Sequence, residues 1–263
     1  MRRMQKRLSI FFQYKDLLKQ LVARDVKLKY RRSILGYIWS VLNPLFIMIV
    51  MTLVFSHMLD NRGIENFPVY LLTGRTMFEF MTSSTNASLR SIVGNAALIK
   101  KCYVPKYIFT LARVTSCMVD FVFSFGALVI VMIFTKAPVT PYALLVPLVI
   151  IQIYIFCCGF GFLLAWLNVY FRDIQQVWKA ITTAWLYATP IFYQIDKLPD
   201  RIQYVVERFN PLYYYITQFR DFVYLGRFPE ARIFWGGWIM AIVALVIGVW
   251  SFQKNQDKFI LYI

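Results

Sequence analysis

Long apolar segments, separated by short polar connections, constrain the fold of this chain more than any other feature of its sequence. A helix needs about 20 mostly apolar residues to cross the hydrocarbon core of a bilayer. Hydrophobic residues make up 59% of the chain, well above the roughly 45–50% of soluble domains. The sequence therefore predicts an all-α integral membrane protein. Six transmembrane helices are expected, at residues 34–58, 67–88, 108–135, 142–169, 177–195 and 234–252.

Positive charge is concentrated in two connections. Residues 1–33 hold 11 Lys or Arg residues against 2 Asp residues, and the loop at residues 95–106 carries three Lys residues and no acid. Short connections rich in Lys and Arg stay on the cytoplasmic side, so both termini are predicted to be cytoplasmic, in the inner membrane. Because topology and anionic lipid headgroups account for the net charge of +16, no nucleic-acid partner is expected.

The segment before the first span predicts an amphipathic helix over residues 8–30. Its apolar residues fall on one stripe, and most of its cations lie elsewhere; the stripe consists of Tyr14, Leu17, Leu18, Leu21 and Leu28. Such a helix lies in the membrane interface, with its cations among the lipid phosphates. Residues 1–33 are therefore interpreted as an interfacial segment and residues 34–263 as the transmembrane domain.

The basic loop between the second and third spans predicts a short helix. Residues 96–103 fit two helical turns, and Pro105 would stop them before the next span. A short cytoplasmic helix tied at both ends to membrane spans can transmit force from a soluble partner. We interpret it as a coupling helix, formed with its flanks by Asn95, Leu98, Ile99, Lys100, Lys101, Tyr103, Pro105 and Lys106.

Several spans carry residues that are unusual within a membrane. Pro44 lies inside the first span, where a kink or a break is expected. Arg75 and Glu79 are four residues apart in the second span and can pair on one helix face, either as a structural pair or lining a channel. Arg113 and Asp120 place two further charges in the third span.

The outer connection at residues 196–233 predicts two short amphipathic helices. The first is opened by Pro199 and closed by Pro211, and the second ends at Gly226. Their many aromatic residues suggest a re-entrant hairpin that dips into the outer leaflet. In the fourth span, Gly159 and Gly161 would let another helix approach closely.

The sequence lacks the motifs of an enzyme. It contains no Gly-x-x-x-x-Gly-Lys-Ser/Thr loop for nucleotide phosphates and no arrangement of paired carboxylates that suggests hydrolysis. The single histidine, His57, and the four cysteines are not spaced for a metal site or a disulfide framework. We therefore expect no metal, no cofactor and no catalytic residue, and any uphill transport must draw on an ion gradient or a partner.

Five motifs, in order along the chain, resemble the permease subunits of ABC-2 type polysaccharide exporters. They are Leu-Lys-Tyr-Arg-Arg-Ser-Ile-Leu-Gly-Tyr-Ile-Trp-Ser at residues 28–40 with Asn43-Pro44, Asn-x-x-Leu-Ile-Lys-Lys-x-Tyr-x-Pro-Lys at 95–106, Leu-Asn-Val-Tyr-Phe-Arg-Asp-Ile at 167–174, Pro-Ile-Phe-Tyr at 190–193 and Asn-Pro-Leu at 210–212. The resemblance implies a homodimer that works with two copies of a separate ATPase subunit, which binds ATP and Mg. It also implies a lipid-linked glycan substrate, such as an O-antigen, a capsular glycan or a teichoic acid.

The resemblance also suggests roles for two further groups of residues. A lipid pyrophosphate entering from the inner leaflet would meet Lys27, Lys29, Arg31 and Arg32, although positive-inside anchoring explains the same residues. Aromatic rings offer an apolar face to the C–H surface of a sugar, whereas interfacial aromatic belts are the alternative explanation. The predicted translocation path is lined by Trp185, Tyr187, Tyr193 and Tyr215.

Other functions remain open on the sequence alone. An ABC-2 exporter of a small drug or lipid would share the same spans. An ion-driven secondary transporter could use Arg75, Glu79 and Asp120 as a proton relay, but such proteins usually contain internal repeats, and no clear repeat relates the two halves. A membrane-embedded enzyme is disfavoured because a catalytic constellation is missing.

Overall fold

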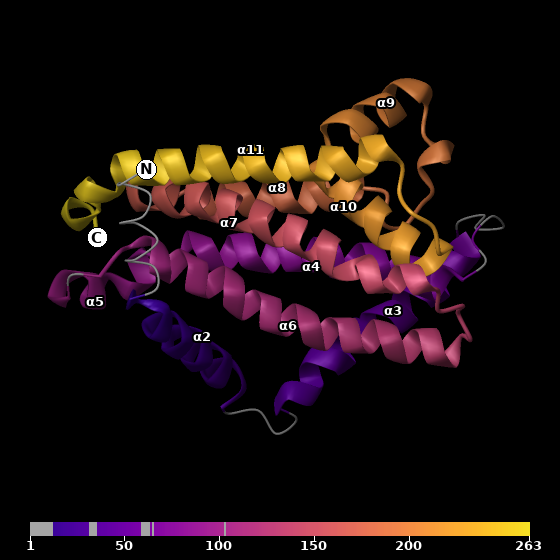
Figure 1. The fold of residues 1–263 in the computed structure, drawn as a ribbon, viewed down its shortest axis with the longest axis horizontal. Helices are drawn as coiled ribbons and strands as arrows, with labels where there is room; N and C mark the ends of the chain where they lie inside the picture. The colour runs from indigo at the N-terminus through magenta and orange to yellow at the C-terminus, as the bar shows by residue number, and fades with distance from the viewer. Residues whose placement is uncertain (1–12, 32–35, 59–63, 65, 103) are drawn as a thin grey trace.

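A computed structural model describes residues 13–31, 36–58, 64, 66–102 and 104–263 of the chain. Every regular element in these ranges is helical, which confirms the all-α class. The helices form an elongated bundle (Figure 1), with the C-terminus and the short helix α5 (Ala96–Lys101) at one end. The helices α9 (Asp200–Phe209) and α10 (Pro211–Arg220) lie at the other end.

The long helices occur where the sequence predicts spans. They are α3 (Trp39–Met58), α4 (Phe67–Leu89), α6 (Tyr107–Phe134), α7 (Val146–Tyr170), α8 (Ile174–Ala188) and α11 (Ala231–Asn255). Among the described residues, 3 helical segments are long and apolar enough to cross a membrane, at Tyr107–Phe134, Pro141–Tyr170 and Ala231–Leu261. A shorter apolar helix covers Trp39–Val54. A total of six spans therefore stays a prediction.

Helix α4 is less apolar than these segments because much of its surface faces protein. It packs against α3, α6, α7, α8 and α10. Several of its buried hydroxyl groups bond back to carbonyl oxygens of its own preceding turn, as when Thr76 donates to Leu72 at 2.7 Å and Ser88 donates to Ser84 at 2.7 Å. This pattern satisfies polar side chains inside a helix without a partner from another element.

Glycines allow α7 and α11 to approach closely. A Cβ added at Gly159 would lie 2.3 Å from the backbone carbon of Ala244, and one at Gly248 would lie 1.9 Å from the carbonyl oxygen of Gly159. A Cβ at Gly161 would lie 2.6 Å from Oγ of Ser88. The close helix approach predicted at Gly159 and Gly161 is therefore confirmed.

Two predicted helix limits need correction. Helix α8 ends at Ala188 rather than at residue 195, because Pro190 forces the preceding Thr189 into an extended conformation with φ −102° and ψ 134°. Helix α3 continues through Pro44, so the chain does not break there, and the alternative expectation, a kink, stays a prediction. The predicted coupling helix is shorter than residues 96–103: it ends at Lys101, and Cys102 is already extended ahead of Pro105. Tyr103 lies outside the described residues.

The N-terminal helix α2 spans Lys15–Tyr30, while residues 8–12 of the predicted helix and Arg32 lie outside the described residues. Most of its apolar stripe faces protein: Leu21 is buried, and Tyr14, Leu17 and Leu18 pack against the same core. Leu28, the last residue of the predicted stripe, is 58% exposed. Helix α2 runs along the first half of α6. It therefore belongs to the same folded body as the predicted spans.

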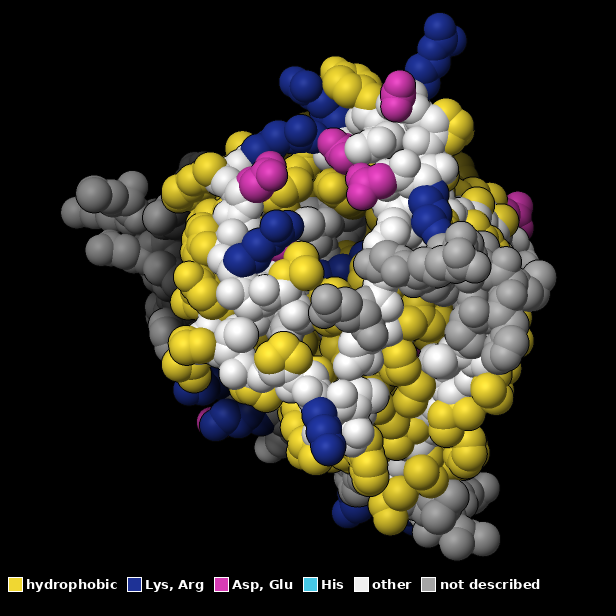
Figure 2. Space-filling view, turned by 90° about the vertical axis from the view of Figure 1, so that its right-hand side faces the viewer, with side chains coloured by type: hydrophobic (Ala, Val, Ile, Leu, Met, Phe, Trp, Pro, Cys, Tyr) yellow, Lys and Arg dark blue, Asp and Glu magenta, His cyan; other side chains and the backbone are white. Residues whose placement is uncertain are grey.

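The two outer helices occur as predicted, at α9 and α10. A π-helical turn, Asp221–Leu225, follows α10 and ends at Gly226 with φ +62°, which glycine adopts readily. Helix α9 is largely exposed, whereas most of α10 is buried. Figure 2 shows this end, where charged side chains gather over α9 and hydrophobic side chains cover the lower flank. Insertion of the hairpin into the outer leaflet stays a prediction.

Candidate functional site

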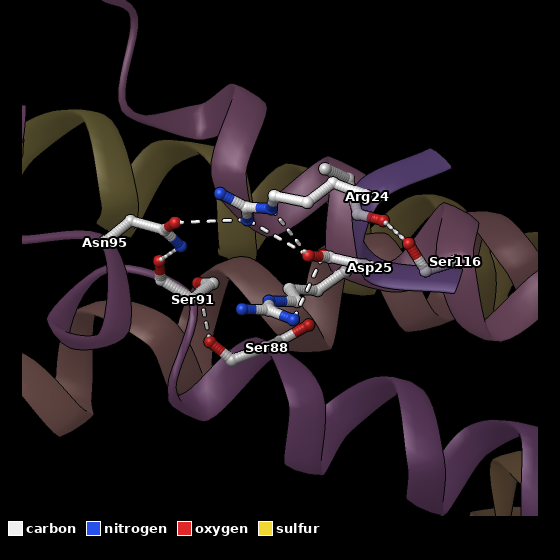
Figure 3. A network of polar contacts seen from close by, with 8 residues as sticks. Arg24, Asp25, Ser88, Ser91, Asn95 and Ser116 are labelled. Carbon is white, nitrogen blue, oxygen red and sulfur yellow. Dashed lines mark hydrogen bonds and ion pairs between the residues drawn. The ribbon is translucent and has the colours of Figure 1, made fainter. Parts of the chain in front are cut away.

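A buried carboxylate joins the N-terminal helix to the third predicted span (Figure 3). The side chain of Asp25 on α2 is only 6% exposed, and its Oδ2 lies 3.0 Å from Nη1 of Arg113 on α6. Its Oδ1 lies 3.0 Å from Nη2 of Arg24. A carboxylate at low dielectric needs such partners to remain charged. Asp25 therefore fixes two arginines from different helices at one point.

The same network reaches the start of α5. Nη2 of Arg24 donates to Oδ1 of Asn95 at 3.3 Å, and Nδ2 of Asn95 donates to the carbonyl oxygen of Ser91 at 2.7 Å. Oγ of Ser91 also lies 2.9 Å from Oγ1 of Thr110 on α6. Asn95 immediately precedes α5. Asn95 therefore links the start of α5 to α2 and, through Ser91, to the segment after α4 and to α6 (Figure 3).

A second ion pair ties α2 to α6 farther along both helices. Nζ of Lys29 lies 2.8 Å from Oδ2 of Asp120. Both charges predicted within the third span, Arg113 and Asp120, thus pair with α2. Lys27 and Arg31, the other described cations of the predicted pyrophosphate group, are exposed.

Lys106, which follows α5 and directly precedes α6, contacts the C-terminal segment Gln256–Leu261. Nζ of Lys106 donates to the carbonyl oxygen of Gln256 and lies 5.5 Å from the ring centroid of Phe259. Burial lowers the pKa of the Lys106 ammonium, and Asp257 acts in the opposite direction. Within the predicted coupling group, Ile99 is buried, Leu98 and Pro105 are half-buried, and Lys100 and Lys101 are exposed. Ile99 anchors α5, and the lysines face outward.

A polar groove lies between α4 and α8. It has a cavity volume of about 370 Å³ and is lined by Arg75, Phe78, Glu79, Thr82, Ser83, Asn86, Thr182, Thr183 and Leu186. Nε of Arg75 lies 3.9 Å from Oε2 of Glu79. The two charges therefore lie side by side, as predicted, and both line this groove. The sequence showed the pair but not the α8 residues opposite it.

The aromatic residues of the predicted path differ in accessibility. Tyr187 is 65% exposed at the end of α8, and the hydroxyl of Tyr193 donates to its carbonyl oxygen at 2.9 Å. Trp185 is half-buried, with Nε1 donating to Oδ1 of Asn210 at 2.8 Å. Tyr215 is fully buried, and its hydroxyl donates to the carbonyl oxygen of Gly237 at 3.1 Å. Tyr215 therefore packs in the core rather than at a surface.

Sequence reasoning missed Arg220, a buried cation on α10. Its Nη1 donates to the carbonyl oxygen of Pro190 at 2.8 Å, and its Nη2 donates to those of Tyr70 and Ile191, each at 3.2 Å. The guanidinium carbon lies 3.5 Å from the ring centroid of Tyr70. Arg220 thus holds the chain where α8 stops. The available signal was that Arg220 is the one charged residue in the sequence of α10.

Comparison with known proteins gives one family match and several relatives. A family model described as ABC-2 type transporter matches residues 16–224. The O-antigen export system permease protein RfbA of Klebsiella pneumoniae is 29% identical over 248 residues, covering 93% of each chain. RfbA of Myxococcus xanthus is 28% identical over 94% of this chain and 95% of its own. The polysialic acid transport protein KpsM of Escherichia coli is 22% identical over 92% of this chain and 95% of its own. The matched residues include the network of Asp25 and the groove.

Proposed function

The chain belongs to the ABC-2 type transporter family, and from that premise we propose that it is the membrane-spanning permease subunit of an ATP-driven exporter of a lipid-linked polysaccharide, most simply an O-antigen. The observation that carries this proposal is the similarity to O-antigen export permeases over 93% of both chains. The family match favours this function over the ion-driven transporter and the membrane-embedded enzyme. The proposed relay acid Asp120 is, moreover, paired with Lys29.

ATP binding and hydrolysis belong to a separate ATPase subunit, which holds the nucleotide and Mg. Its docking surface is α5, whose exposed Lys100 and Lys101 face outward while Ile99 anchors the helix. The path of the force follows from the contacts of Asn95, which joins α5 to Arg24 and to Ser91. A conformational change of the ATPase would therefore be transmitted through α5 to α2, α4 and α6 together.

The substrate path runs along the groove between α4 and α8. Polar and charged side chains such as Arg75 and Glu79 are unfavourable against lipid chains, so this face needs water or protein opposite it. A second copy of the chain, placed with its own groove facing the first, would enclose a polar conduit. Tyr187, Tyr193 and Trp185 stand at its outer end, and the exposed Lys27 and Arg31 stand where the lipid pyrophosphate enters.

The orientation follows from the charges. With α5 and the N-terminal segment in the cytoplasm, the positive-inside rule is satisfied at both basic connections. The C-terminal segment packs against Lys106 beside α5, which supports a cytoplasmic C-terminus and therefore an even number of spans, six in this proposal. The outer helices α9 and α10 then face the opposite side, where the glycan leaves.

Deletion of the gene in its own host tests the proposed function. Surface polysaccharide should disappear, and the lipid-linked glycan should accumulate in the inner membrane, as measured by immunoblotting intact cells and extracted lipids. A plasmid copy should restore export, and a copy with Lys100→Glu and Lys101→Glu should not, because it reverses the charge of the docking surface. Normal surface glycan in the deletion strain would refute the proposal.

A further inference from the structure

The groove between α4 and α8 contains one continuous polar stripe. Between residues 75 and 86 of α4, the half-exposed side chains are all polar and recur every three or four residues: Arg75, Glu79, Thr82, Ser83 and Asn86. This spacing places them on one face of the helix. Across the groove, α8 adds Thr182 and Thr183. The stripe is thus suited to a hydroxyl-rich ligand.

The charged pair in this groove keeps hydrogen-bonding capacity. Nε of Arg75 and Oε2 of Glu79 are 3.9 Å apart, which exceeds the roughly 2.7–3.2 Å of an N–H···O hydrogen bond. Nε of Arg75 and Oγ1 of Thr82 have no hydrogen-bond partner among the described residues. Both atoms are buried, so a ligand would reach the charged pair through the exposed parts of its side chains, which are 23% of Arg75 and 38% of Glu79.

We propose that the groove is a glycan subsite that selects uncharged sugar units over acidic ones. One hydroxyl of a vicinal diol accepts a hydrogen bond from Arg75, and its neighbour donates one to Glu79. Phe78 and Leu186, which also line the groove, provide apolar walls for the C–H face of the ring. The Glu79 carboxylate repels a sugar carboxylate or phosphate, which Arg75 alone would attract. This inference rests on the proposed function, because it requires a glycan in the groove.

Thiol protection tests this subsite directly. Ser83→Cys places a reactive group in the groove, and the native Cys102, exposed in the loop after α5, serves as an internal reference outside it. The complex with its ATPase is reconstituted in nanodiscs and labelled with a small charged thiol reagent. Labelling is repeated with a neutral mannose oligosaccharide and with an acidic galacturonate oligosaccharide, each at millimolar concentration.

The neutral oligosaccharide should slow labelling of Ser83→Cys several-fold and leave Cys102 unchanged, while the acidic one should have no effect at either site. Adding Glu79→Gln should let the acidic oligosaccharide protect Ser83→Cys as well. If Glu79→Gln does not fold, Asn86→Lys provides the second variant, because an added cation in the groove should have the same effect.

Three results would overturn the subsite: no labelling of Ser83→Cys, no protection by the neutral oligosaccharide, or equal protection by both in the unaltered groove. Surface glycan is measured in cells that carry the same Ser83→Cys variant. Normal export without protection would reject the subsite alone, whereas a gene deletion that leaves surface glycan unchanged would reject the exporter itself.

Discussion

Arg220 shows how a single buried cation can hold an irregular segment in place. It donates to three carbonyl oxygens, two of which belong to Pro190 and Ile191, just after α8 ends. Gly74 makes room for it, because a Cβ there would lie 2.8 Å from Nη2 of Arg220. The end of α8 and the turn of α4 at Gly74 are thus fastened to α10 through one side chain.

Replacing Arg220 with Gln should destabilise the protein. Each buried carbonyl oxygen that loses its donor costs about 1–3 kcal/mol, and Gln can satisfy only some of the three. The melting temperature of the purified permease in detergent, followed by tryptophan fluorescence, should fall by several degrees. Arg201→Gln is the matched control, since Arg201 is exposed on α9. Equal melting temperatures for the two variants would contradict the assignment.

Asp25 permits a charge-balance test at the same scale. Asp25→Asn removes the carboxylate shared by Arg24 and Arg113, so two cations remain close together without compensation. Folded yield and ATP-dependent export should both fall. Adding Arg113→Gln removes one of those cations and should recover part of the yield. A double variant that is worse than Asp25→Asn alone would show that the ion pair does not account for the effect.

At the scale of helices, the apolar runs and the Pro and Gly positions predicted most of the bundle. Apart from the end of α8, the long helices from α6 to α11 begin and end within a few residues of their predicted limits, because hydrophobic length and helix-breaking residues act locally. The end of α8 at Ala188 could also have been predicted. Thr189 precedes Pro190, and a residue that precedes a proline disfavours the helical conformation. The contacts of Asp25 with Arg113 and of Arg220 with Tyr70 could not be predicted, because these partners are 88 and 150 residues apart in the sequence.

The crossing of α7 and α11 gives a prediction at this scale. Gly248→Ala places a Cβ 1.9 Å from the carbonyl oxygen of Gly159, so the helices must separate and lose packing along their contact. Gly126→Ala on α6 is the matched control, because a Cβ there meets nothing within 4 Å. Folded yield, measured by size-exclusion chromatography, should drop for Gly248→Ala only. A comparable yield for both would show that close approach is not required.

For the whole molecule, α4 connects the two candidate regions. Its C-terminal end joins the network of Asn95 through Ser91, and its half-exposed face lines the groove. Nε1 of Trp178 on α8 donates to Oγ1 of Thr85 at 3.0 Å, which ties the opposite wall of the groove to the same helix. Helix α4 therefore links the network beside α5 to both walls of the groove.

ATP-driven passage of glycan through this chain is the central claim, and inside-out membrane vesicles measure it most directly. The vesicles contain the permease, its ATPase and radiolabelled lipid-linked glycan, and a membrane-impermeant glycan-degrading enzyme is added outside. On addition of ATP, the glycan should become protected from the enzyme. Vesicles with a hydrolysis-deficient ATPase, or without the permease, should show no protection. Equal protection with and without the permease would contradict the account.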